Sequence, residues 1–212
     1  MPGTVVHLAF SGMLAAALLG AAFDRKAVAV VFAVTAFPDL DSFIALVSVA
    51  GHRTVLHNLV VPTVAMLVLW VDTSLRSRSV VRERWGAWGV RVAWVSLVAY
   101  VVSGVGLDFV GGSVNLLYPL HDQFYNLEGA IRLSDQRGFV QTFVELGDGD
   151  LLGGQGSSEQ INISTGVDPD PSGKEETPER VFNVVRTGWG LLILVVGTLV
   201  TWARFRLSHA LE

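Results

Sequence analysis

Cysteine is absent from the 212 residues of the chain. Its absence excludes disulfide bonds, thiolate ligands and a cysteine nucleophile, so any metal site must use nitrogen and oxygen ligands. Charged residues are also scarce: they make up 16% of the sequence, against roughly 25% in soluble domains. Hydrophobic residues make up 51%. This balance is typical of a protein that is solvated largely by lipid.

Three familiar signals are missing as well. The net charge of −4 gives no reason to expect a nucleic-acid partner. No Lys-Ser or Lys-Thr pair follows the glycine-rich residues 153–156, which excludes a phosphate-binding P-loop there. Residues 1–4 carry no Lys or Arg, and the apolar run that follows is long, so we expect a retained span and not a signal peptide.

Long apolar segments predict about five membrane spans, because a transmembrane helix needs roughly 20 mostly apolar residues. The expected fold is an all-α, polytopic transmembrane helical bundle whose second span is broken at Pro38. An alternative for residues 42–50 is a re-entrant or interfacial segment. The expected spans cover residues 5–23, 28–50, 55–71, 87–107 and 188–203.

Composition divides the chain into three parts. We expect a membrane-embedded core over residues 1–120 and a final span with a basic tail over residues 187–212. Between them, residues 121–186 are polar, acidic and rich in glycine, which predicts an extracytoplasmic loop that is disordered in part.

Basic residues predict the orientation, because Lys and Arg gather in cytoplasmic loops. Three basic clusters fall on one side of a five-span arrangement, which should be the cytoplasm. The N-terminus and the acidic loop of a multi-pass cell-membrane protein should then lie outside, and the C-terminus inside. The clusters are Arg25 with Lys26, the four arginines of residues 76–84, and Arg204 with Arg206.

A few charged or imidazole side chains lie within or beside the apolar segments, where an ionised group costs ~2.5–3.5 kcal/mol. The predicted topology brings all of them to the outer face of the membrane, although it was built from the basic loops alone. This convergence predicts one shared polar site. The residues are His7, Asp39, Asp41, His52, Arg53, His57 and Asp108.

Imidazole and carboxylate groups are ligands for divalent metals, and we expect zinc first and manganese second. Asp39 and Asp41 would face the same side if the segment after Pro38 is extended. Asp41, or alternatively Asp39, is the expected general base. Arg53 is expected to hold a phosphate group, because its planar fork matches phosphate oxygens. The expected ligands of one or two ions are His7, Asp39, Asp41, His52, His57 and Asp108.

Simpler roles exist for the same residues. Asp41 is a suitable N-cap for a helix that begins at residue 42, and Asp108 is a suitable cap for a turn. Arg53 has the length to snorkel to lipid headgroups, and His7 alone is an ordinary polar residue of the interface.

The ordered set of motifs resembles the YdjM-type family of predicted inner-membrane-associated, metal-dependent hydrolases. The resemblance covers about residues 1–120 and implies a metal-dependent hydrolase. The position of the site, at headgroup level, favours membrane lipid as the partner and a lipid phosphoester as the substrate. The motifs are His7, Pro38-Asp39-Leu40-Asp41, Gly51-His52-Arg53-Thr54-Val55-Leu56-His57-Asn58, Ser103-Gly104-Val105-Gly106-Leu107-Asp108 and Gly112-Ser113-Val114-Asn115-Leu116-Leu117-Tyr118-Pro119.

The sequence departs from the family pattern at Gly104, where the family carries a histidine, and glycine cannot ligate a metal. Leu56 and Asn58 are further departures, and His121 is an imidazole that could replace the lost one. Two functions therefore stay open: a hydrolase, and a catalytically degenerate member with a structural, metal-binding or partner-binding role. A transporter would need Asp39 near the bilayer centre and far from His52.

Overall fold

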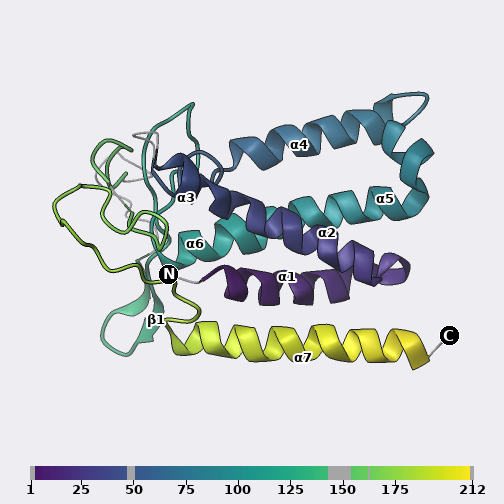
Figure 1. Cartoon of the computed structure of the whole chain (residues 1–212). Helices are drawn as coiled ribbons and strands as arrows, with labels where there is room; N and C mark the ends of the chain where they lie inside the picture. The colour runs from purple at the N-terminus through teal and green to yellow at the C-terminus, as the bar shows by residue number, and fades with distance from the viewer. Residues whose placement is uncertain (1–2, 47–50, 143–153, 162, 211–212) are drawn as a thin grey trace.

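The computed structural model describes residues 3–46, 51–142, 154–161 and 163–210. Helices α1, α2, α4, α5 and α7 lie side by side in an elongated bundle, and a two-stranded hairpin lies outside it (Figure 1). The elements are α1 (Thr4–Leu18), η1 (Gly20–Ala22), α2 (Arg25–Ala36), η2 (Phe37–Leu40), α3 (Asp41–Ile44), α4 (Val60–Trp70), η3 (Val71–Leu75), α5 (Val80–Ala99), η4 (Tyr100–Val105), α6 (Gly106–Gly111), β1 (Ile131–Ser134), β2 (Gly138–Gln141) and α7 (Gly188–Ala210). Segments η1 and η2 are 3-10 turns, whereas η3 and η4 are π-helical.

Three helical runs of the described chain are long and apolar enough to cross a membrane: Arg25–Ile44, Val80–Gly111 and Gly188–Ser208. Two further apolar helices, Thr4–Leu18 and Val60–Leu75, are shorter. The helical character of the bundle and three candidate spans thus agree with the sequence, whereas five spans stay a prediction. Helix α5 is kinked at Gly86, whose φ of +65° lies in the left-handed region that glycine tolerates.

The break at Pro38 takes a different form from the expected one. Pro38 lies in the first turn of η2, where its missing N–H costs no hydrogen bond, so the chain tightens into a 3-10 turn and continues as α3. Asp39 and Asp41 therefore do not lie on an extended segment, which was the condition for both to face the same side. Residues 47–50 of the expected second span lie outside the described residues.

The third expected span, residues 55–71, corresponds to α4, which begins five residues later than expected. Residues 55–59 belong to a turn, and α4 starts only at Val60. The side chain of Asn58 accepts a hydrogen bond from the Val61 N–H at 2.9 Å, which satisfies a free donor of the first helical turn. Residues 55–59, which include His57, therefore lie outside the apolar helix α4.

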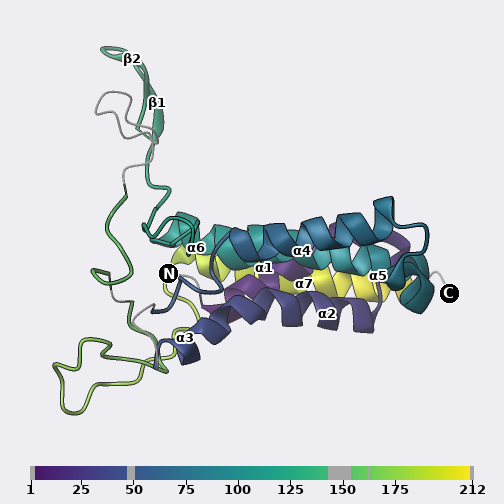
Figure 2. The same cartoon turned by 90° about the horizontal axis from the view of Figure 1, so that it is seen from above.

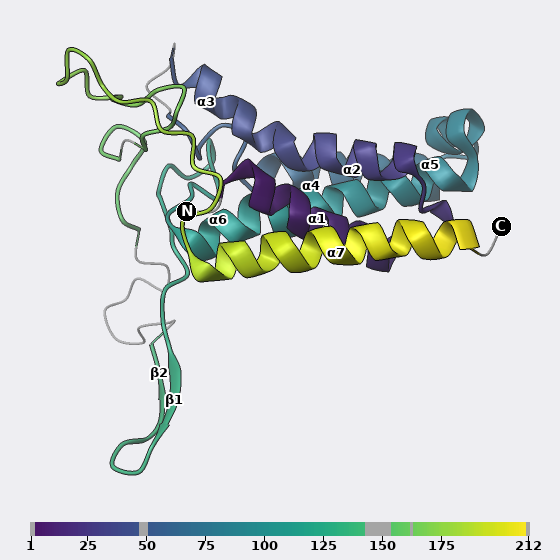
Figure 3. The same ribbon diagram turned by 60° about the horizontal axis from the view of Figure 1, so that its bottom comes forward.

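Helix α1 lies against both α2 and α7 (Figure 3). The contact with α7 is unusually close, because a Cβ atom at Gly197 would lie 2.3 Å from the carbonyl oxygen of Ala9. A Cβ atom at Gly12 would lie 2.4 Å from the Thr201 hydroxyl. Small residues thus let the two backbones approach, as in packed membrane helices.

The two ends of the bundle differ. The α1–α2 turn, the α4–α5 turn and the end of α7 share one end, which is where the three basic clusters lie in the sequence (Figure 1). The N-terminus, α3, α6 and the long polar segment share the other end. There, β1 and β2 pair antiparallel from Ile131↔Gln141 to Ser134↔Gly138 and project away from the helices (Figure 2). The composition of residues 121–186 had predicted only a loop in this region.

The close contact of α1 and α7 yields a prediction. Gly197→Val places a side chain against the backbone of Ala9, and overpacking of this kind costs ~1–3 kcal/mol, so the thermal unfolding midpoint in detergent should fall. Gly188→Val makes the same change in α7 at a position with nothing within 4 Å and should leave the midpoint almost unchanged. Equal midpoints for the two variants would contradict the packing.

Candidate metal centre

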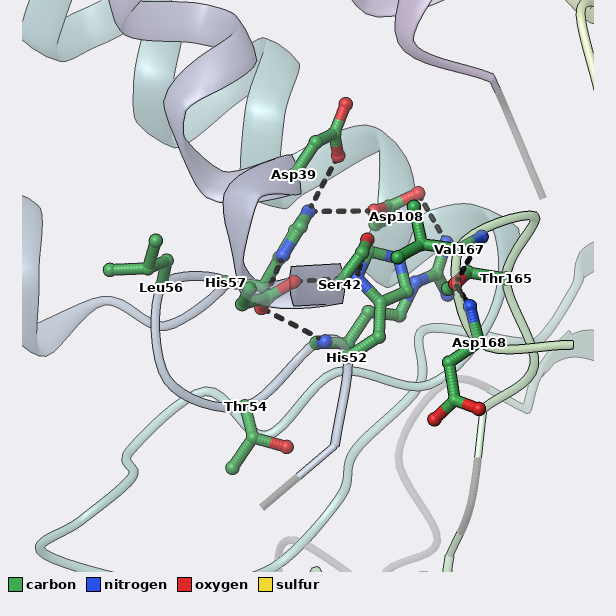
Figure 4. A network of polar contacts seen from close by, with 12 residues as sticks. Asp39, Ser42, His52, Thr54, Leu56, His57, Asp108, Thr165, Val167 and Asp168 are labelled. Carbon is green, nitrogen blue, oxygen red and sulfur yellow. Dashed lines mark hydrogen bonds and ion pairs between the residues drawn. The ribbon is translucent and has the colours of Figure 1, made fainter. Parts of the chain in front are cut away.

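A cluster of polar side chains lies at the end of the bundle where η2, α3, α6 and residues 51–59 meet (Figure 4). Four side chains each bring one nitrogen or oxygen atom within 4.8 Å of all the others. Two imidazoles and two carboxylates form a donor set that zinc and related divalent ions accept. The four residues are Asp39, His52, His57 and Asp108.

Asp41 holds the two imidazoles in place. Its side chain is fully buried, and its oxygens lie 2.5 Å from His52 Nδ1 and 2.8 Å from His57 Nδ1. It also accepts the backbone N–H of Arg53 at 3.0 Å. A carboxylate that binds Nδ1 of an imidazole leaves Nε2 as the nitrogen available to a metal. Both oxygens of Asp41 are engaged in this way, and Asp41 is not among the four clustered residues.

The Nε2 atom of His57 is the strongest sign that the cluster fits a cation. It is buried, 3.2 Å from an Asp39 oxygen and 3.3 Å from an Asp108 oxygen, yet it has no hydrogen bond of good geometry within the described residues. Burial alone would lower the pKa of His57, but the carboxylates of Asp108, Asp39 and Asp41 raise that pKa well above its ordinary value. The three carboxylates therefore favour a positive charge at this point, which either a proton on the imidazole or a bound cation supplies.

Asp108 is fixed from two further sides. Arg53 donates a hydrogen bond from its guanidinium to one Asp108 oxygen, and Nε2 of His7 lies 3.5 Å from the same oxygen. His7 is itself oriented by Ser103, because its Nδ1 donates to the Ser103 carbonyl at 2.5 Å and the Ser103 hydroxyl donates to the His7 carbonyl at 2.6 Å. His7 is not one of the four clustered residues, although it contacts one of them, Asp108.

Arg53 is buried, at 1% exposed. Besides Asp108, its guanidinium donates to the Ser113 carbonyl at 3.3 Å, and its Nε has no partner within the described residues. Its φ of +69° is in the left-handed region, which is uncommon for a residue with a Cβ atom. Such backbone strain persists where surrounding contacts determine the conformation, and here the bond from its N–H to Asp41 does so.

Three supporting residues were not predicted from the sequence. Thr4 donates to Asp39 at 2.5 Å, the Ser42 hydroxyl lies 3.2 Å from His52 Nδ1, and the Tyr100 hydroxyl donates to the Leu56 carbonyl. Thr4 lies one helical turn before His7, so helical spacing was an available signal. No local pattern marks Tyr100, because only tertiary packing brings it to residue 56.

The structure also describes Gly104, where the resemblance implied a histidine, and His121, the imidazole that was expected to replace it. A Cβ atom at Gly104 would lie 3.3 Å from a Pro38 side-chain carbon and 3.4 Å from the Thr35 carbonyl oxygen, so η4 packs closely against η2. His121 is exposed, and its ring stacks on Tyr125 with the centroids 6.2 Å apart. His121 is not part of the cluster of four.

Metal affinity tests the arrangement. Asp41→Asn should weaken zinc binding by roughly 10–100-fold, the usual effect of removing a carboxylate that orients a histidine ligand. Competition against a chromophoric chelator would measure this in detergent. His121→Ala is the matched control, since its imidazole lies apart from the cluster, and it should bind zinc as the unaltered protein does. An unchanged affinity in Asp41→Asn would contradict the assigned role.

Comparison with known proteins agrees with the motifs. A search of curated proteins and a search of solved structures found no match. A family model described as YdjM inner membrane protein matches residues 1–210, well beyond the part that carries the motifs. Together with three helices able to cross a membrane, this match supports a membrane protein. The chain therefore belongs to the YdjM family of inner membrane proteins.

Proposed function

We propose that the protein is a membrane-bound, metal-dependent hydrolase that acts at the extracytoplasmic membrane–water interface, with lipid phosphoesters as its substrate class. The observation that carries the proposal is the buried His57 Nε2 between two carboxylates, with His52 beside them and Asp41 orienting both imidazoles. The family supports the membrane location.

The ligands of the proposed ion are His52, His57, Asp39 and Asp108. A divalent ion held by them supplies Lewis acidity, which activates water and stabilises negative charge on the substrate. His7 and Asp41 contribute by orienting these ligands and not by direct binding. Zinc is the proposed metal because the nitrogen and oxygen donors suit it, and manganese is the second choice.

Asp39 is the more exposed of the two candidate bases, and if its Oδ1 holds the ion, its Oδ2, which accepts a bond from Thr4, is the oxygen left to take a proton. Its side chain is 27% exposed, whereas those of Asp41 and Asp108 are 0% and 3% exposed. A general base must reach a water molecule and accept its proton. Asp41 is enclosed by donors on both oxygens, so its proposed role is to position the histidines.

The proposed topology has five spans with the basic end in the cytoplasm. It is supported by the side-by-side course of the five longest helices and by the gathering of the basic turns at one end (Figure 1). The four clustered residues and the polar residues 121–186 then lie on the extracytoplasmic side of the membrane. This places the site at the level of lipid headgroups, which supports a lipid phosphoester as substrate.

The absence of cysteine makes the topology simple to test. A cysteine at Ser134 in the hairpin should react with a membrane-impermeant maleimide in intact cells. A cysteine at Ser77, between α4 and α5, should react only after the membrane is permeabilised. The reverse pattern, or equal labelling of both, would contradict the orientation.

Hydrolysis can be tested with chromogenic phosphomonoesters, phosphodiesters and carboxylic esters, using zinc- or manganese-loaded protein. We expect one phosphoester class to be hydrolysed, chelation to abolish the rate, and Asp39→Ala to lower kcat by at least about 100-fold. His121→Ala should keep the full rate. A protein that binds zinc tightly but hydrolyses none of these esters would have the non-catalytic, metal-binding role instead.

A further inference from the structure

We propose that Arg186 binds the anionic group of an amphiphilic substrate whose apolar part lies against Phe43 and Phe182. The chemistry done on that substrate rests on the proposed function, but the binding role of Arg186 does not. A cavity of about 440 Å³ opens above the cluster of Asp39, His52, His57 and Asp108. Asp39, His52 and Asp108 are among the residues that line it.

Two guanidinium groups line the cavity, and they differ in availability. That of Arg53 is buried and already paired with Asp108 and the Ser113 carbonyl. Arg186 is exposed and has no ion pair with any described residue. Arg53 was expected to bind phosphate, but Arg186 is the guanidinium that makes no hydrogen bond or ion pair with the described residues and so can donate to a ligand.

The balance of charges around the cavity also favours Arg186 as the group that binds an anion. Asp39, Asp41 and Asp108 bring three carboxylates to the cluster, and Arg53 compensates one of them. A divalent ion would compensate the other two, so the floor of the cavity would be close to neutral. An anionic ligand then needs a further cation on the wall, and a guanidinium suits phosphate oxygens.

The segment that carries Arg186 is held firmly over the cavity. Arg180 donates to the Gly166 and Val167 carbonyls at 3.3 and 2.7 Å, which joins residues 180–186 to the turn beside the site (Figure 4). A Cβ atom at Gly166 would lie 2.5 Å from the Phe182 ring, and one at Gly3 would lie 2.1 Å from the Asn183 carbonyl oxygen. The covering segment is therefore packed on the start of α1.

Apolar side chains line the same cavity beside these charges. Phe43 is 57% exposed and Phe182 is 69% exposed, and Val5, Val181 and Val184 also line the wall and are exposed. A small water-soluble phosphate would leave this surface in water. An amphiphile would cover it while its phosphate meets Arg186, which favours burial of its apolar part.

Binding of hexyl phosphate to the zinc-loaded, full-length protein in a neutral detergent tests the proposal by calorimetry. Arg186→Gln should weaken binding at least about tenfold, since it removes a charge-assisted contact, and Arg186→Lys should restore part of it. Arg137→Gln removes the same charge from the distant hairpin and should change binding less than about twofold. Full affinity in Arg186→Gln, with an unchanged unfolding midpoint, would overturn the assignment.

Inorganic phosphate separates the two parts of the ligand. It should bind more weakly than hexyl phosphate, and Phe43→Ser should weaken hexyl phosphate alone. Equal binding of the two ligands would overturn the amphiphilic part of the proposal. Loss of Arg186-dependent binding contradicts this inference even if esters are hydrolysed, whereas intact binding without hydrolysis contradicts only the proposed reaction.

Discussion

The buried carboxylate of Asp41 is the interaction on which the polar end of the bundle depends. It joins both histidines of the turn and the backbone of Arg53 to the start of α3. A buried carboxylate is costly unless donors satisfy it, so the turn and α3 stabilise each other. Because Asp41 binds one nitrogen of each ring, it also fixes which nitrogen faces the cavity. The hydrogen bonds that fix the local structure are thus the same ones that orient the imidazoles of the candidate metal site.

The remaining ligands arrive from separate parts of the chain, and each comes with a partner. Asp39 is held by Thr4 of α1, and Asp108 is held by His7 and Arg53. These contacts tie the first helix to elements a hundred residues away, so helix packing and ligand geometry are coupled. The floor of the site is thus held by several mutual contacts, while residues of the segment 164–186 line its wall.

The sequence predicted the helical bundle and the convergence of the polar residues because both follow from strong physical costs: apolar length needs lipid, and ionisable groups in apolar helices need partners. The sequence could not predict which four of the six expected ligands lie together and that the other two, His7 and Asp41, contact these four instead. His7 and Asp41 have the same chemistry as the others, and only the rotation of α1 and the 3-10 turn at Pro38 decide where they point. The hairpin was missed because residues 121–186, taken as a whole, have the polar, glycine-rich composition that is also typical of disorder.

The π-helical turn η4 has a consequence for how this chain tolerates change in length. Its Gly106 N–H bonds the Val101 carbonyl, five residues back, so the turn holds one residue more than an α-helical turn. Each residue of an α-helix adds about 100° of rotation. Loss of a single residue between Tyr100 and Val105 would therefore leave an ordinary α-helical turn and keep Asp108 facing His57, whereas loss of a residue from the regular part of α5 would swing Asp108 by about that angle. A comparison of related chains should accordingly find one-residue deletions at this turn more often than in the regular part of α5, although hydropathy alone would not distinguish the two.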